Sequence, residues 1–160
     1  MSKKRDELLE QMWAAQDTAY DLMSEYDSQP HSYGENILYQ AEAHLIDLIA
    51  LNPDVTVTDL AGMVRKTPSA CSQIVRKLRA KGWVEQVRNA ANNRQMMLRL
   101  TPAGEHVYRD HAAFDRQCQA LTFQRLEGFT EAELAAYLAI QQQINEAYAD
   151  DVRRSHEYFT

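Results

Sequence analysis

The fold is decided by residues 56–82, TVTDLAGMVRKTPSACSQIVRKLRAKG, which encode two short helices with a basic turn between them. Thr56, with Asp59 three positions later, forms a capping pair that predicts a helix start after Thr56. The pair Thr67-Pro68 predicts a second start, because proline at the first helical position loses no hydrogen bond. The pair Lys81-Gly82 predicts where that helix ends, since glycine adopts the left-handed cap easily. Two short helices joined by a tight turn indicate a helix-turn-helix.

The second of these helices has two chemically different faces at about 100° per residue. Its apolar side chains fall within a sector of about 100°, and we expect them to be buried: Cys71, Ile74, Val75 and Leu78. The opposite face carries side chains that can approach DNA base edges, where Gln suits adenine, Arg suits guanine and Ser suits either. The residues predicted for this role are Pro68, Ser69, Ser72, Gln73 and Arg76. An ordinary amphipathic helix explains the apolar sector equally well, but it does not explain why acids are absent from the polar face.

Polar and cationic residues flank this face and are better placed for phosphates than for bases. The predicted phosphate contacts are Thr56, Arg65, Lys66, Thr67, Lys77, Arg79 and Arg88.

A hairpin follows the two helices. Residues 83–87 and 96–100 are predicted strands, and the second alternates apolar and polar side chains. The Asn/Ala-rich connection between them is longer than a two-residue turn and carries Arg94 near its tip. This order of elements predicts a winged helix-turn-helix.

Longer helices surround the central segment. Apolar periodicity predicts helices over about 6–27, about 35–51, 102 to about 127, and 131 to about 154. The predicted fold class is therefore mainly α with a small β-wing.

Charge is strongly segregated along the 160-residue chain, whose formal net charge is −6. Residues 62–103 hold nine Lys/Arg and one acid, Glu85, for a net charge of +8, while the remainder carries −14. A solvated charged face would more often mix the signs, so the segregation favours a cationic binding lobe on an acidic frame.

Composition restricts the remaining classes of protein. The chain is long enough for one domain with a real core, and it has no run of about 18 apolar residues. We therefore expect a soluble, cytoplasmic protein with no membrane partner. The two cysteines, Cys71 and Cys118, have no metal-ligand or disulfide spacing. Cys71 lies on the predicted buried face and is expected to be inert, whereas the role of Cys118 stays open.

The motifs resemble those of the multiple antibiotic resistance regulator (MarR) family. The resemblance rests on Thr56–Ala61, Pro68–Arg79, Lys81–Val84 and Asn92–Gly104, and the flanking helices extend it to nearly the whole chain. It implies a homodimeric transcription factor whose two winged lobes bind a pseudo-palindromic operator within a long-helix dimer frame. The roles expected for the segments are N-terminal dimerisation (1–34), DNA binding (35–101) and C-terminal dimerisation (102–160). Members of the family commonly repress, and they release DNA when a ligand, oxidant or metal changes the spacing of the lobes.

The resemblance also gives the wing a role. It implies that Arg94 enters the minor groove, where narrow A·T-rich sequence favours a cation. The family usually has aspartate at the position of Asn92, which accepts a hydrogen bond but forms no ion pair.

The effector of such a regulator is left open by the sequence. A small-molecule pocket would use aromatic and polar groups, for which the candidates are Trp13, Tyr33, Tyr39, His44 and Tyr108. No metal site and no cofactor are predicted, because the pairs Glu42/His44 and His106/His111 have poor chelating spacing. A metal-responsive regulator of the same fold stays an alternative.

Two other classes of function are weaker. No phosphate loop, HExxH or nucleophile elbow is present, so we expect no enzyme. A helical protein-interaction adaptor would suit the long terminal helices, but it leaves the basic segment unexplained.

Overall fold

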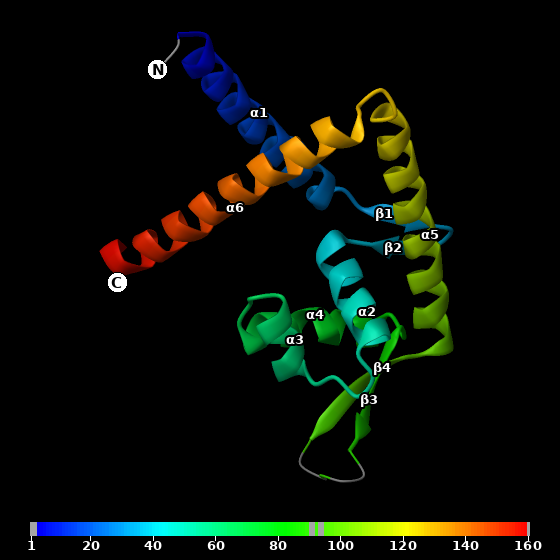
Figure 1. Ribbon diagram of the computed structural model, residues 1–160. Helices are drawn as coiled ribbons and strands as arrows, with labels where there is room; N and C mark the ends of the chain where they lie inside the picture. Colours follow the sequence, from blue (N-terminus) through cyan, green and yellow to red (C-terminus); the bar gives the residue numbers. More distant parts are fainter. Residues whose placement is uncertain (1–2, 90–91, 93–94, 160) are drawn as a thin grey trace. The chain divides into compact units, whose positions relative to one another are not determined.

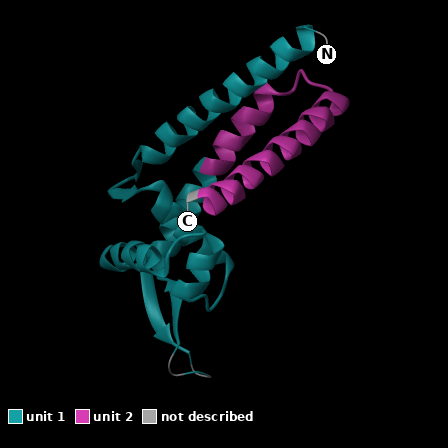
Figure 2. Cartoon of the chain, turned by 90° about the vertical axis from the view of Figure 1, so that its left-hand side faces the viewer, with its two compact units in different colours: residues 1–114 teal, residues 115–160 magenta. Residues whose placement is uncertain are grey.

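The computed structural model describes residues 3–89, 92 and 95–159 (Figure 1). The chain divides into two compact units, residues 1–114 and residues 115–160 (Figure 2). The elements, in chain order, are α1 (Lys3–Ser28), β1 (His31–Tyr33), β2 (Asn36–Leu38), α2 (Gln40–Leu51), α3 (Val57–Met63), α4 (Pro68–Ala80), β3 (Val84–Arg88), β4 (Met96–Leu100), α5 (Pro102–Arg125) and α6 (Glu131–Phe159). Helix α5 runs from the first unit into the second, and α6 lies wholly in the second. The prediction of a mainly helical chain with a small β-wing is confirmed. The assignment of dimerisation to residues 1–34 and 102–160, and of DNA binding to residues 35–101, stays a prediction.

Both predicted helix starts in the central segment are confirmed. The Thr56 hydroxyl accepts from the backbone N–H of Asp59 at 3.2 Å, and the Asp59 carboxylate accepts from the backbone N–H of Thr56 at 2.9 Å. This reciprocal capping box begins α3. The Thr67 hydroxyl accepts from the backbone N–H of Ala70 at 3.2 Å, and Pro68 is the first residue of α4.

The predicted start of the second helix is wrong. The sequence places it near residue 35, whereas α2 begins at Gln40 and the residues before it form the antiparallel hairpin β1–β2. Gly34, at φ 63°, supplies the left-handed turn of this hairpin. Leu38 at the end of β2 is fully buried. Strands of three residues carry too little pattern for the sequence to separate them from a helix start.

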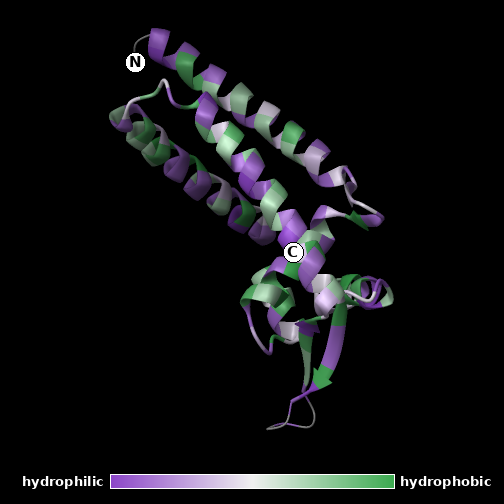
Figure 3. Ribbon diagram, turned by 90° about the vertical axis from the view of Figure 1, so that its right-hand side faces the viewer, coloured by the Kyte–Doolittle hydropathy of each residue, from purple (hydrophilic) through white to green (hydrophobic). Residues whose placement is uncertain are grey.

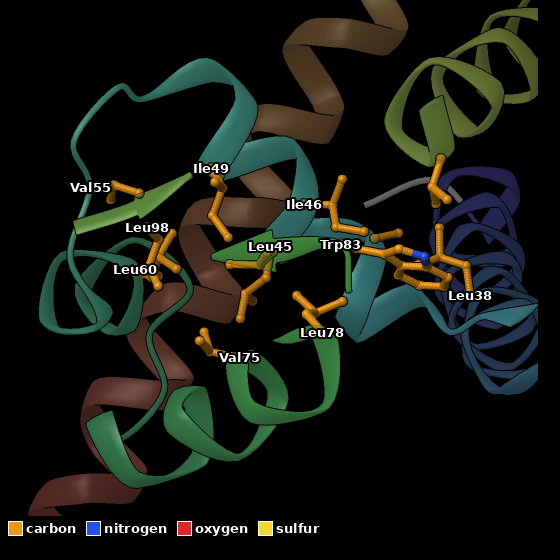
Figure 4. Packing of buried hydrophobic residues seen from close by; sticks show 13 residues of the cluster. Leu38, Leu45, Ile46, Ile49, Val55, Leu60, Val75, Leu78, Trp83 and Leu98 are labelled. Carbon is orange, nitrogen blue, oxygen red and sulfur yellow. The ribbon is translucent and has the colours of Figure 1, made fainter. Parts of the chain in front are cut away.

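One hydrophobic cluster organises the first unit. Figure 4 shows Leu45, Ile46 and Ile49 of α2 facing side chains from α3, α4 and the β-wing. Those side chains include Leu60, Val75, Leu78 and Leu98, all of which are almost completely buried. Burial of this apolar surface is what holds the two short helices against α2, since helices of this length are marginal alone.

The start of α5 is fastened to the end of α4. The backbone N–H of Thr101 donates to the Trp83 carbonyl at 3.0 Å, and the Thr101 hydroxyl donates to the Gly82 carbonyl at 2.6 Å. Gly104 packs so tightly here that a Cβ added to it would lie 1.9 Å from the Trp83 carbonyl oxygen. Only glycine therefore fits at this position.

The substitution Gly104→Ala should destabilise the protein by about 1–3 kcal/mol, because the new methyl group meets main-chain atoms that have no rotamer to change. Gly62→Ala is the matched control, since a Cβ there meets nothing within 4 Å. The control should be neutral or up to about 1 kcal/mol stabilising. Urea unfolding at one pH measures both, and equal stability of the two variants would contradict this packing.

Candidate nucleic-acid interface

Helix α4 buries one face and exposes the other. Cys71, Val75 and Leu78 are buried and Ile74 is half-buried, which confirms the predicted apolar sector. The opposite face consists of exposed side chains: Pro68, Ser69, Ser72, Gln73 and Arg76. The structure thus brings the five residues proposed for base contacts onto one accessible surface.

Six exposed cations lie on this face or on the residues that flank it: Arg76 on the face, and Arg65, Lys66, Lys77, Arg79 and Arg88 beside it in the basic segment. Within the part of the chain that the structure describes, none of the six forms an ion pair. Unpaired, exposed cations are what a polyanion needs, because their charge is not already neutralised by the protein. We name these six residues, together with the outward face of α4, the basic surface.

Two further cations of the basic segment are engaged within the fold. Lys81 Nζ lies 2.7 Å from Glu42 Oε2, donates to the Ile37 carbonyl at 2.8 Å, and sits 4.6 Å from the centre of the Trp83 ring. Arg99 donates to Asp54 Oδ1 at 2.8 Å. These two cations therefore stabilise the lobe and contribute little to its outer charge.

The β-wing is joined to the helix-turn-helix by main-chain contacts. Strands β3 and β4 pair antiparallel, with Val84 opposite Leu100 and Arg88 opposite Met96. The backbone N–H of Leu98 donates to the Val55 carbonyl at 2.8 Å, and Thr56 forms a β-bridge with Met97. Val55 and Thr56, which precede α3, thus pair with β4 and extend the hairpin. In Figure 1 the hairpin projects beyond α3 and α4.

The structure describes part of the connection between β3 and β4. The backbone N–H of Asn92 donates to the Asn89 carbonyl at 3.2 Å, and the N–H of Gln95 donates to the Asn92 carbonyl at 2.9 Å. Arg94, the residue predicted for the minor groove, lies outside the described residues.

Thr56 and Thr67, two predicted phosphate contacts, use their hydroxyls as helix caps. The Thr56 hydroxyl also donates to Asp59 Oδ2 at 2.7 Å. This bond, and the backbone N–H of Thr56, hold the pKa of the Asp59 carboxyl below its ordinary value. The phosphate role of both threonines stays a prediction.

Comparison with known proteins identifies similar sequences and structures. Residues 38–95, which contain α2, α3, α4 and β3 but end before β4, match the family model described as "MarR family". This central part of the chain, which is less than half of its length, is thus similar to the MarR family.

Individual relatives of this chain are distant. A curated protein of Bacillus subtilis (strain 168), described as "Uncharacterized HTH-type transcriptional regulator YhjH", is 25% identical over 97 residues. That match covers 61% of this chain and 55% of the relative, so the chain spans about half the length of the curated relative.

Solved structures share the fold of this chain. Streptococcus pneumoniae FabT in complex with DNA has a TM-score of 0.68 at 22% identity, covering 90% of this chain and 97% of that one. The MarR family transcription regulator SP03579 has a TM-score of 0.70 at 20% identity, covering 94% and 95%. The zinc-responsive MarR family member ZitR of Lactococcus lactis has a TM-score of 0.73 at 16% identity, covering 88% and 99%. At these identities the likeness shows the fold alone.

The five residues predicted for an effector pocket do not line one common hollow among those described. His44 lines a cavity of about 510 Å³ beside α2, Tyr108 lines one of about 540 Å³ beside α5, and Tyr39 lines one of about 400 Å³ beside Trp83. The Tyr33 hydroxyl lies 2.8 Å from Nδ1 of the buried His111, and Trp13 is exposed on α1. A single pocket formed by all five stays a prediction.

The candidate metal ligands were also located. His106 Nε2 lies 3.5 Å from Asp110 Oδ2, while His44 is exposed on α2. Over residues 3–89, 92 and 95–159, no group of three or more His, Cys, Asp or Glu side chains is arranged to hold a metal ion. In the same residues, no helix combines the length and the apolar character that crossing a membrane requires.

The capping box at Thr56 should make stability depend on pH. Because the folded-state pKa of Asp59 is lowered, its ionised form stabilises the fold above the unfolded pKa, and this contribution is lost as pH falls through the folded value. The stability difference between the parent and Asp59→Asn should therefore shrink below about pH 4. Urea unfolding between pH 3 and pH 7 measures it. Thr56→Val, which removes the larger cause of the shift, should also reduce the pH dependence, and an undiminished difference at pH 3 would count against this account.

Proposed function

We propose that this chain is a sequence-specific double-stranded DNA-binding transcription regulator that acts as a homodimer. The observation that carries the proposal is the basic surface, where five groups suited to base edges are ringed by cations without ion pairs in the described chain. A regulator of this kind works in the cytoplasm beside the chromosome, and we propose that it represses.

The proposed recognition combines two kinds of contact. The N-terminal part of α4 enters the major groove, where Ser72, Gln73 and Arg76 form hydrogen bonds with base edges. The flanking cations, among them Lys66 and Arg79, bind phosphates and give affinity without sequence information. Arg94 extends the footprint into the adjacent minor groove.

The proposed dimer rests on apolar side chains that a single chain leaves exposed. Figure 3 shows hydrophobic residues recurring along α1 and α6. On α6 the exposed large side chains are Leu134, Tyr137, Leu138, Ile140, Tyr148, Val152 and Tyr158. On α1 they are Leu8, Leu9, Trp13, Tyr20, Leu22, Met23 and Tyr26. Exposed large apolar side chains in this number on each helix favour a protein–protein interface, and a C₂ dimer would place two basic surfaces on successive half-sites.

Relatives support the DNA-binding proposal over its alternatives. One structural neighbour was solved in complex with DNA, and the curated relative is described as an HTH-type transcriptional regulator. MarR proteins are transcriptional regulators, which are not enzymes. A protein-interaction adaptor would leave the basic surface without a role. The metal-responsive alternative draws support from the zinc-responsive neighbour alone.

The variant Arg76→Gln should lose specific DNA affinity by roughly tenfold or more, because a bidentate arginine–guanine contact discriminates by about 1–3 kcal/mol. Arg94→Gln should weaken binding at A·T-rich flanks in particular. Electrophoretic mobility shifts on an operator selected from a random duplex pool measure both. Arg116→Gln, which removes the same charge from α5, is the matched control. DNA-binding is refuted if folded Arg76→Gln and Arg94→Gln proteins bind as tightly as the parent.

The variant Leu138→Asp should raise the dimer dissociation constant at least about tenfold, because it places an unpaired carboxylate in a surface that association desolvates. Ala147→Asp introduces the same charge on the opposite side of α6 and serves as the control. Sedimentation velocity over a concentration series measures association. If the parent sediments as a monomer at all concentrations, the proposed dimer is wrong.

A further inference from the structure

The face that α4 buries determines which of its side chains point outward. Cys71 and Leu78 are completely buried and Val75 almost completely. Figure 4 shows Val75 and Leu78 pointing into the hydrophobic cluster. Because these side chains are packed in the core, α4 cannot turn about its axis without losing their contacts. The set of outward side chains is therefore fixed by the fold.

Three of the outward side chains form a row along α4. At about 100° and about 1.5 Å per residue, Ser69, Gln73 and Arg76 fall within a sector of about 60° and a length of about 10 Å. All three are exposed. Over the described residues, none of the three forms a side-chain hydrogen bond or an ion pair. We name Ser69, Gln73 and Arg76 the outward row.

One cation lies on each side of the outward row. Lys77 and Arg79 are rotated from Ser69 by about 80° in opposite directions, and both are exposed. A helix with its side chains is about 10–12 Å wide, which matches the major groove at about 12 Å. With the outward row toward the bases, each of the two cations therefore lies beside a different phosphate backbone.

The spacing of the outward row determines which base pairs it reaches. In zinc fingers, side chains three positions apart on a helix in the major groove contact successive bases. Gln73 and Arg76 are three positions apart, and Ser69 precedes Gln73 by four. The rise from Gln73 to Arg76 is about 4.5 Å, and a base-pair step is about 3.4 Å. These two long side chains therefore reach neighbouring base pairs.

We propose that each operator half-site contains an A·T pair bound by Gln73 directly beside a G·C pair bound by Arg76, and that the base pair facing Ser69, on the other side of the A·T pair, is weakly specified. A primary amide forms two hydrogen bonds with adenine, a guanidinium group forms two with guanine, and a hydroxyl suits several bases. Helix α4 contains no Asp or Glu, the side chains that accept from cytosine N4. The inference rests on the proposed function and adds the order of the bases to it.

The double variant Gln73→Arg/Arg76→Gln tests this order, because it exchanges the two side chains and keeps the net charge and composition of the protein. Duplexes selected from a random pool by the full-length parent should contain the neighbouring A·T and G·C pairs in each half-site. Those selected by the double variant should contain the same two pairs in exchanged order, with the other positions unchanged. In mobility shifts, a duplex with one half-site in the exchanged order should bind the parent roughly a hundredfold more weakly, since each mismatched pair costs about tenfold or more.

The single variants Gln73→Ala and Arg76→Ala locate each contact separately. Each should make a different one of the two neighbouring positions degenerate in the selected duplexes. Lys77→Gln/Arg79→Gln is the control for charge. It should weaken binding to every sequence and lower the slope of log affinity against log salt by about 1.8, without changing the selected bases.

The outcomes separate the inference from the proposed function. A selected half-site without neighbouring A·T and G·C pairs overturns the inference while sequence-specific binding stands. The same holds if the exchanged variant selects the parent's sequence, or if the two alanine variants affect positions that are not neighbours. A parent that enriches no sequence from the pool overturns the proposed function and the inference together.

Discussion

The ion pair between the buried Glu42 carboxylate and the partly exposed Lys81 ammonium group is the constraint on which the lobe depends. Glu42 is 5% exposed, and its carboxylate both caps the start of α2 through the Tyr39 N–H and pairs with Lys81 at the end of α4. Removing Lys81 would leave the almost fully buried Glu42 carboxylate without its cation, which is the destabilising case for such a pair. Since Lys81 also donates to the Ile37 carbonyl, one ammonium group joins β2 and α2 to the residue that caps the C-terminal end of α4.

Local signals made much of the first unit predictable. Capping residues act within three positions of each other, so Thr56 with Asp59 and Thr67 with Pro68 located α3 and α4 from the sequence. The buried face of α4 followed from helical periodicity alone. These features depend on no distant residue, which is why the sequence was sufficient.

Long-range contacts made the remainder unpredictable. Lys81 Nζ donates to the carbonyl of Ile37 in β2, which lies 44 positions earlier in the chain. No local sequence pattern predicts a contact over that separation. The left-handed backbone of Arg65 and the buried Gln40 oxygen are likewise products of packing. The count of nine Lys/Arg in residues 62–103 has a related weakness. It includes Lys81 and Arg99, which are paired with Glu42 and Asp54, together with the cations that form no ion pair in the described residues. Sequence distinguishes a structural cation from a functional one only when its partner is nearby.

The bridge between Thr56 and Met97 connects the β-wing directly to the start of the helix-turn-helix. The Leu98–Val55 hydrogen bond and the paired strands tie the residues just before α3 to the base of the hairpin. For a DNA-reading protein, the number of base pairs between the major-groove and minor-groove contacts is then set by the protein and cannot adjust to the operator. Insertion of one base pair between those two contact regions would rotate one of them by about a tenth of a turn relative to the other. On the proposed function, the molecule would recognise a length along the duplex as well as the bases themselves.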